Sequence, residues 1–345
     1  MKKMLALLLA LVMVLSLAAC ASSQPAAAST ETAETTETTE PAAEEPAEAP
    51  AESGKTYTVG VCQLVQHEAL DAATQGFIDA LKEELGDAVT VDVQNASGDS
   101  VNCGTIVNGF VSKGVDLIMA NATPALTAAV SATADIPILG TSITAYGVAL
   151  DIDDFNGTVG GNVSGTSDLA DLQAQAQMIL DWFPETKTVG LLFCSAEPNS
   201  RYQIDEVRKA LEAQGVTCEE FAFTDSNDVS SVTQKAADFS DVVYLPTDNT
   251  AASNTEAIAN VLIPAGVPAI CGEEGICRGC GVATLSISYY DLGVTTGKMA
   301  AKILKGEADI STMPVEYTDA TPKYNASVCE QLGITPLDGY EAIDG

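Results

Sequence analysis

The sequence has few of the residue types that catalyse reactions or bind polyanions. Its 345 residues include one histidine, one tryptophan and 15 lysines and arginines, against 48 aspartates and glutamates, which gives a net charge of −33. A chain this acidic, without a basic stripe, repels nucleic acid. No P-loop, H-E-x-x-H or G-x-S-x-G motif occurs, and a lone histidine cannot build a catalytic triad without a nucleophile. We therefore expect neither an enzyme nor a nucleic-acid-binding protein, and no cofactor.

Long apolar runs are also missing, except at the N-terminus. After two lysines, an apolar run covers residues 4–17, and small residues then lead to Cys20. This run is too short for a permanent span, so residues 1–19 are predicted to be a signal peptide. Leu17-Ala18-Ala19-Cys20 is typical of a bacterial lipobox, in which the final cysteine carries a lipid. We expect a chain anchored by Cys20 to the outer face of the bacterial cell membrane, with an ordinary secretory signal as the alternative.

Residues 20–54 contain hardly any apolar side chain larger than alanine and are rich in Ala, Glu, Thr, Pro and Ser. Such a segment cannot bury enough surface to offset the entropy of ordering it. We predict a disordered acidic tether between the lipid and the folded part of the chain.

From residue 55 onward, short β-branched runs alternate with amphipathic segments, which is typical of βα units on a parallel sheet. The cycle occurs twice, so we predict an α/β protein with two lobes, each built on a doubly wound parallel sheet. In the first half, strands are expected at residues 57–63, 89–94, 117–121 and 136–140, and helices at 69–85, 99–112 and 124–132. In the second half, strands are expected at 188–194, 217–223, 242–246 and 268–271, and helices at 199–214, 229–237 and 251–265.

A further helix, at residues 289–305, is expected to return to the first lobe, where Gly293 and Gly297 allow close packing. The tail then crosses back to the second lobe, so three segments form a hinge. We assign residues 55–165 and 288–308 to the first lobe, and residues 166–287 and 309–345 to the second.

Several sequence blocks between Thr56 and Pro336 resemble one family of receptors. They are VGVCQLVQHEALDAATQGFIDAL, ANATPAL, DIPILGTSIT, LLFCSAEPNS, YLPTDNTAAS and EEGICRGCGVATLSISYYDLGVTTGKMAAKILKG. The chain resembles the ABC-transporter substrate-binding family that includes the tryptophan and tyrosine receptors of Gram-positive bacteria. The resemblance implies a type I periplasmic-binding-protein fold and delivery of a small solute to a membrane permease. The chain departs from it at Glu68, where the resemblance implies proline, and in the cysteine-rich stretch CGEEGICRGCG.

The loops that follow the strands are the candidate ligand site, because doubly wound sheets bind ligands beyond the carboxyl ends of their strands. A zwitterionic amino acid needs an anionic acceptor beside neutral donors. Asp248 is the candidate acceptor, with Glu273 and Glu274 as alternatives, and helix capping is the other role open to Asp248. Thr123, as a helix N-cap, and Ser142 are candidate donors to a carboxylate. We predict ligand contacts from Gln66, His67, Thr123, Ser142, Ser195, Asn199, Asp248 and Asn249.

Eight cysteines remain after Cys20. Cys62 and Cys194 lie in expected strands and are predicted to be core residues. Cys277 and Cys280 form one C-x-x-C, with Cys271 upstream, and the spacing leaves open a local disulfide, free thiols, or a metal or redox site.

These features together predict a monomeric receptor that closes on an amino acid, aromatic or apolar, and passes it to an ABC permease. A sugar or nucleoside is the alternative ligand. A thiol-based redox or metal-binding surface protein is the alternative from another class.

Overall fold

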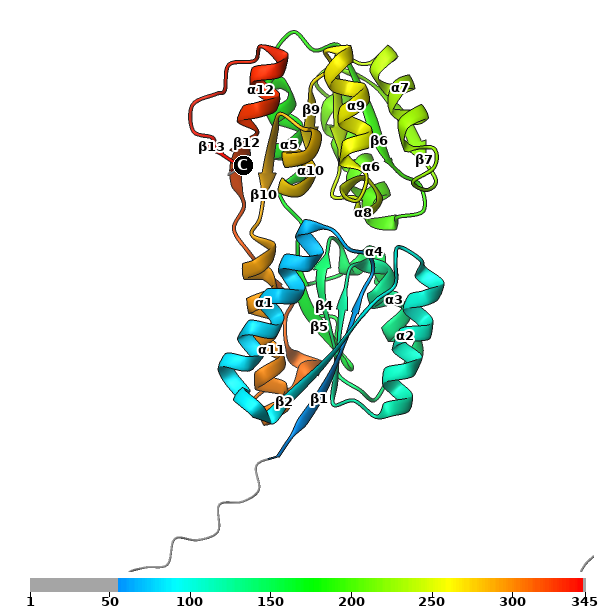
Figure 1. The fold of residues 1–345 in the computed structure, drawn as a ribbon, viewed down its shortest axis with the longest axis vertical. Coiled ribbons are helices and arrows are strands. Elements are labelled where there is room, and N and C mark those ends of the chain that lie inside the picture. The colour runs from blue at the N-terminus through cyan, green and yellow to red at the C-terminus, as the bar shows by residue number, and fades with distance from the viewer. Residues whose placement is uncertain (1–54, 344–345) are drawn as a thin grey trace, which may run out of the picture. The chain divides into compact units, whose positions relative to one another are not determined.

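The computed structural model describes residues 55–343, which form two lobes around two sheets (Figure 1). The signal peptide, Cys20 and the tether expected at residues 1–54 lie outside the described residues. The first sheet has six strands in the order β11-β5-β4-β3-β1-β2, and the second has seven in the order β13-β12-β10-β9-β8-β6-β7. The predicted α/β class with two largely parallel sheets is confirmed. None of the helices in this range is long and apolar enough to cross a membrane.

The first lobe covers its sheet with α1 and α11 on one face and α2 and α3 on the other. Phe77 and Phe110, both fully buried, lie in the two core clusters of this lobe. Its elements are β1 (Tyr57–Gln63), α1 (Glu68–Leu85), η1 (Gly86–Ala88), β2 (Val89–Asn95), α2 (Ser100–Lys113), β3 (Leu117–Asn121), α3 (Thr123–Ala132), β4 (Ile138–Ile143), α4 (Tyr146–Ala149), β5 (Val163–Ser167), α11 (Tyr289–Lys305), η2 (Ile310–Thr312) and β11 (Glu316–Tyr317).

The second lobe is similar, but it has an antiparallel pair, β10 with β12, at one side of the sheet. Phe193 and Tyr244 are its largest fully buried side chains in one core cluster. Its elements are α5 (Leu172–Trp182), β6 (Thr188–Cys194), α6 (Pro198–Glu212), β7 (Thr217–Phe223), α7 (Val229–Phe239), β8 (Val242–Leu245), α8 (Asn249–Ala252), α9 (Thr255–Ala265), β9 (Ala269–Cys271), α10 (Glu274–Cys280), β10 (Ala283–Ser286), β12 (Thr321–Tyr324), α12 (Ala326–Leu332) and β13 (Glu341–Ala342).

Helix α11 packs along α1 of the first lobe, as Figure 1 shows. Glycines permit the close approach. A Cβ atom on Gly293 would lie 2.0 Å from the carbonyl oxygen of Ala73, and one on Gly76 would lie 2.1 Å from that of Tyr290. Helix α11 ends at Gly306, which adopts the left-handed conformation typical of a helix C-terminus (φ 75°).

The chain passes between the lobes three times, after β5, after β10 and after β11. The boundary that we placed at residue 308 is wrong. Strand β11 pairs with β5 in the first sheet, with Glu316 opposite Thr166, and the Ser164 hydroxyl donates to the Met313 carbonyl at 3.0 Å. The tail therefore stays in the first lobe until Tyr317, because it extends the open edge of that sheet.

Two of the expected elements differ most from the observed ones. The helix expected at residues 251–265 is two helices, α8 and α9, separated at Ser253 and Asn254. Strand β4 continues to Ile143, beyond the end expected at residue 140. The sequence analysis did not identify several elements, among them β5, α5, α10 and β10. Strand β5 has the small, largely polar sequence VSGTS, which lacks the β-branched apolar pattern of a core strand.

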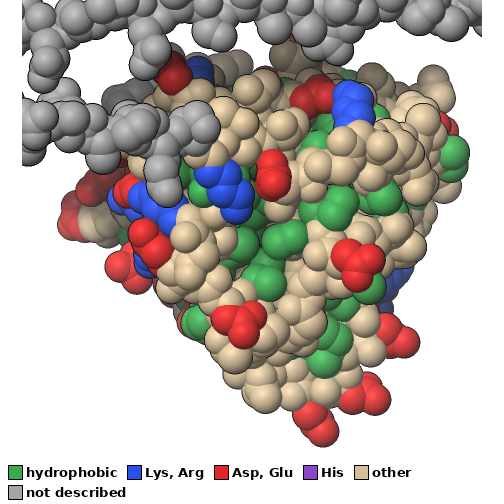
Figure 2. All heavy atoms as spheres, turned by 90° about the horizontal axis from the view of Figure 1, so that it is seen from below, with side chains coloured by type: hydrophobic (Ala, Val, Ile, Leu, Met, Phe, Trp, Pro, Cys, Tyr) green, Lys and Arg blue, Asp and Glu red, His purple; other side chains and the backbone are tan. Residues whose placement is uncertain are grey.

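Charged side chains are dispersed over the face shown in Figure 2, where acidic groups outnumber basic ones. Apolar side chains on this face lie among polar ones. The large negative charge of the chain is thus spread on this face rather than gathered at one point.

Candidate functional site

A cavity lies between the lobes, at the carboxyl ends of the strands. The first lobe contributes His67, Ala69, Leu70, Ser142, Thr144 and Tyr289. The second lobe contributes Asn199, Thr247, Asp248, Asn249, Ala252 and Glu273, and Asp168 lies where the chain leaves β5. The cavity has about 290 Å³ free of protein atoms, but only about 10 Å³ can hold the centre of a water molecule. The lobes are therefore closed on each other, with room for roughly one water.

His67 and Asn249 meet across this cavity. The Nε2 atom of His67 lies 3.2 Å from Oδ1 of Asn249, so the bond requires a proton on Nε2. Burial lowers the pKa of His67, against smaller opposing effects of the Asn249 bond and of the Glu197 and Asp71 charges. The neutral ring therefore suits the closed arrangement better than the charged one does.

Within the described part of the chain, three buried polar atoms on the cavity wall have no hydrogen-bond partner. They are Oγ of Ser142, Oδ1 of Asp168 and Oδ1 of Asn199. A buried polar atom left unpaired costs free energy, and such atoms in a native protein call for an explanation. Two of these atoms are acceptors only, and the third is a hydroxyl that both donates and accepts. A ligand with a cationic donor group and an acceptor group would satisfy all three.

Asp168 is the most distinctive of these groups, because it combines deep burial with one free oxygen. The residue is 5% exposed, and of its two carboxylate oxygens only Oδ2 accepts a hydrogen bond, from the Tyr289 hydroxyl at 2.9 Å. Burial raises the pKa of Asp168, although the hydroxyls of Tyr289 and Thr144 partly oppose this. A cation placed at Oδ1 would restore the ionised form.

Asp248, which we had favoured as the acceptor, is buried on the cavity wall but already fully engaged. Its Oδ2 accepts from the Cys194 N–H at 2.7 Å and the Ser200 hydroxyl at 2.8 Å, and its Oδ1 accepts from the Ala251 N–H at 2.8 Å. Burial, with the nearby Glu197 charge, raises the pKa of Asp248 to about 8. The bond from Ala251 caps α8, the other role left open by the sequence, and the other two bonds tie Asp248 to β6 and α6.

The alternative acceptors after β9 are also occupied. Glu273 caps α10 by accepting from the N–H groups of Gly275 and Ile276, and its pKa is raised by burial to about 7. Glu274 lies outside the cavity and pairs with Arg278 and Lys323.

Ser142 does not follow its strand, as expected, but lies within it. The register of β4 against β5 shifts between Gly140 and Ile143, and Ser142 adopts a left-handed backbone conformation with φ 55°. Such a conformation in a non-glycine residue is uncommon and occurs often at binding sites. The irregularity turns the serine hydroxyl into the cavity wall.

The comparisons with known proteins agree with this arrangement. Residues 58–339 match the family described as ABC transporter substrate binding protein. The chain belongs to this family. It is 33% identical to a tyrosine-binding protein from Clostridioides difficile over 276 residues, 78% of this chain and 79% of that one. The family is one of receptors rather than enzymes.

Two solved structures of relatives differ in how well they superpose on this substrate-binding protein. A domain from Streptococcus pneumoniae in complex with L-Trp gives a TM-score of 0.79 at 32% identity, covering 84% of this chain and all of that one. The ligand-free, open structure of a substrate binding protein with adhesive properties from Clostridium difficile gives 0.65 at 33% identity, with 84% and 99% covered. The better fit to the ligand-bound relative agrees with the closed lobes seen here.

The structure brings five of the eight predicted contact residues to the cavity of this binding protein. Gln66 is exposed and lines a hollow beside His67 instead. Ser195 is exposed and its hydroxyl donates to the Phe223 carbonyl at 3.2 Å. Thr123 is the first residue of α3 rather than its N-cap, because Ala122 with φ 88° occupies the cap position. The five that line the cavity are His67, Ser142, Asn199, Asp248 and Asn249.

The sequence analysis missed Asp168 and Tyr289 as wall residues. Asp168 directly follows β5, the strand that was not identified. A search for carboxylates after every strand would have found Asp168 only if the sequence VSGTS had been accepted as a strand.

The eight cysteines within residues 55–343 are all free thiols. Cys271, Cys277 and Cys280 are buried and close to one another, and burial raises the pKa of Cys271 far above its usual value. Thiols held protonated in this way react slowly. In the described part of the chain, no group of three or more His, Cys, Asp or Glu side chains could hold a metal ion.

Proposed function

We propose that this chain is the lipid-anchored, extracytoplasmic binding subunit of an ABC importer and that it captures a free amino acid between its lobes for a permease. The side chain of that amino acid is aromatic or apolar. The observation that carries the ligand class is Oδ1 of Asp168, a buried carboxylate oxygen that lines the cavity and accepts no hydrogen bond.

The remaining wall supports a zwitterion. Asn199 Oδ1 is a second acceptor for an ammonium group, and the Ser142 hydroxyl is a neutral donor for a carboxylate. Among residues 55–343, no lysine or arginine lines the cavity. Leu70, Ala69 and the Tyr289 ring provide apolar surface for the side chain of the ligand. The relatives named for tyrosine and crystallised with L-Trp favour an aromatic side chain.

In this structure the cavity is too small for an amino acid, so capture requires the lobes to separate, admit the ligand and then close on it around a slightly wider cavity. A ligand that bridges the lobes shifts the population toward the closed form. We expect the protein to act as a monomer, which light scattering would check.

The ligand assignment is tested by calorimetry with tryptophan, tyrosine and phenylalanine, set against sugars and nucleosides. Two analogues test the charged groups of the ligand separately: tryptamine lacks the carboxylate, and indole-3-propionate lacks the ammonium. Amino acids should bind, and indole-3-propionate should bind at least tenfold more weakly than tryptophan. Binding of a sugar or nucleoside and of no amino acid would refute the assignment. The anchor is tested separately by Cys20→Ala, which should release the protein from the membrane fraction and remove labelling by an alkyne fatty acid.

A further inference from the structure

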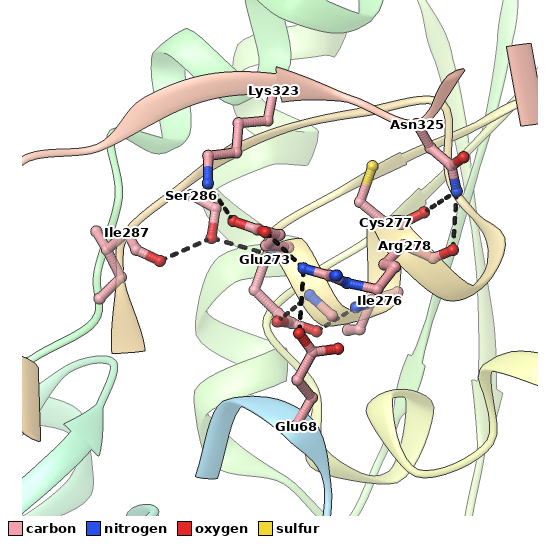
Figure 3. A network of polar contacts seen from close by, with 11 residues as sticks. Glu68, Glu273, Ile276, Cys277, Arg278, Ser286, Ile287, Lys323 and Asn325 are labelled. Carbon is pink, nitrogen blue, oxygen red and sulfur yellow. Dashed lines mark hydrogen bonds and ion pairs between the residues drawn. The ribbon is translucent and has the colours of Figure 1, made fainter. Parts of the chain in front are cut away.

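One ion pair connects the two lobes among the described residues 55–343. In Figure 3, Glu68 at the start of α1 points toward Arg278 on α10, and its Oε1 lies 3.1 Å from Nη2 of Arg278. The other ion pairs in this range each lie within one lobe. Any movement that separates the lobes must therefore break this pair.

Arg278 is held in place by its own lobe. Glu273 caps the start of α10, and the side chain of Asn325 donates to the carbonyl groups of Cys277 at 3.0 Å and Arg278 at 2.8 Å. Figure 3 shows this clamp at the end of the helix. Arg278 is therefore carried by a segment that is fixed at both ends.

Arg278 also forms an ion pair within its own lobe. Glu274 accepts from Arg278 at 2.7 Å and from Lys323 at 2.6 Å. The carboxylate of Glu273 lies close enough for the charge of Glu68 to raise its pKa. When the lobes meet, Glu68 therefore adds an attraction to Arg278 and a weaker repulsion from Glu273.

The helical turn that carries Glu68 is held within the first lobe. The first turn of α1 is held by Asn121, which donates to the Leu70 carbonyl at 2.8 Å, and by Gln63, which donates to Asp71 at 2.6 Å. Glu68 also borders two surface hollows, one shared with His67 and Arg278 and the other shared with Tyr289 and Lys323. The pair thus stands at the rim of the cavity, where the lobes part.

We propose that Glu68 and Arg278 form a closure latch, an ion pair made only in the closed state, which raises ligand affinity and slows ligand release without touching the ligand. The side chains of Glu68 and Arg278 are 56% and 35% exposed, and ion pairs of this kind contribute little energy. The latch should therefore change the ratio of closed to open protein by about 1.5- to fivefold. Its contribution should fall with salt, because the Debye length shortens from about 20 Å near 20 mM to about 4 Å near 0.5 M.

The latch is tested first without any ligand. Spin labels, attached to non-natural ketone side chains to avoid the thiols, are placed at exposed Val101 in the first lobe and exposed Asn227 in the second. Pulsed electron resonance then measures the distribution of distances between the lobes for the wild type, Glu68→Gln, Arg278→Gln and the double variant. At low salt each single variant should shift the distribution toward the open form, and the double variant should add little to either.

The matched control is Glu84→Gln. Glu84 lies on the same helix and pairs with Lys305 at 2.7 Å, but both residues belong to the first lobe. This variant should leave the distances unchanged. Distances in Glu68→Gln that equal those of the wild type at both salt concentrations, or fully additive effects of the two single variants, would overturn the latch.

A second readout depends on the proposed function. With the amino acid that binds most tightly, Glu68→Gln should weaken affinity about 1.5- to fivefold at low salt, mainly through faster release, and the difference from wild type should vanish at high salt. If no amino acid binds, the proposed function fails while the distance measurement still decides the latch. An affinity difference that persists at high salt would contradict a screened ion pair.

Discussion

The Tyr289 hydroxyl donates a 2.9 Å hydrogen bond to Oδ2 of Asp168 and leaves Oδ1 of the same carboxylate free on the cavity wall. Tyr289 is at the start of α11, after the second passage between the lobes, and Asp168 is at the first passage. The bond thus joins two hinge segments and fixes the carboxylate that we assign to the ammonium group of the ligand.

Asp168→Asn should weaken amino-acid binding without lowering the stability of the fold. The variant loses the anionic partner of an ammonium, and hydrogen bonds to charged groups are worth about 1.5–3 kcal/mol, so affinity for an amino acid should fall about 10- to 150-fold. Burial raises the pKa of Asp168, which means that the ionised form is disfavoured in the folded protein. The free energy of unfolding without ligand should therefore hold or rise, as measured by urea denaturation.

Asp153→Asn is the matched control, because Asp153 is exposed and does not line the cavity. It should change neither affinity nor stability. Unaltered affinity in Asp168→Asn would instead place the ammonium elsewhere.

The pH dependence of binding should include a contribution from His67. Its pKa is lowered in the closed form from an ordinary value of 6.5, so below about pH 6.5 the open form takes up a proton more readily and closure weakens. Affinity should fall between about pH 7.5 and pH 5.5. In His67→Gln, which keeps a donor for Asn249 without titrating, the fall should be smaller, and calorimetry at a series of pH values measures the difference.

Protonation of Asp168 also weakens binding at low pH, so the diagnostic quantity is the gap between wild type and His67→Gln. Parallel pH profiles for the two proteins would exclude a role for His67.

How far the sequence could predict this molecule depends on which residues form each strand. The bounds of strands such as Tyr57–Gln63 and Thr188–Cys194 were predicted correctly, because a short buried run of β-branched residues is typical of a strand in a parallel sheet. Strand β5 was not predicted, because its small residues VSGTS have a low strand propensity. They fit the close packing of this strand against β4 and α11. Gly165 shows why: a Cβ atom there would lie 2.0 Å from the Gly140 carbonyl oxygen.

The candidate site was predictable in position but not in detail. The ends of the strands do surround the cavity, and Asn199 and Ser142 do line it. The different roles of Asp248 and Asp168 could not be predicted from the sequence, because both are carboxylates that follow a strand. Only the three hydrogen bonds that occupy Asp248, and the free oxygen of Asp168, separate a cap from a candidate ligand contact.

The packing of α1 on α11 gives a stability prediction. Gly293→Ala would place a methyl group 2.0 Å from the Ala73 carbonyl oxygen, which forces the two helices apart. We expect a loss of about 1–3 kcal/mol in the free energy of unfolding. Gly109→Ala, in α2 with no atom within 4 Å of the added Cβ, should instead gain about 0.5–1 kcal/mol from helix propensity. Equal effects in the two variants, measured by urea denaturation, would contradict the close approach.

The buried thiols provide the final prediction. Because Cys271, Cys277 and Cys280 are free and buried, a reductant should leave the melting temperature of the native protein unchanged, and a thiol reagent should react with them only as the protein unfolds. Cys277→Ala with Cys280→Ala should lower stability, because small cavities replace the two sulfur atoms, but should leave affinity for an amino acid within about twofold. Loss of binding with stability retained would revive the thiol-based function. Cys218→Ala serves as the control, since Cys218 is half-buried and lies far along the chain from the other three.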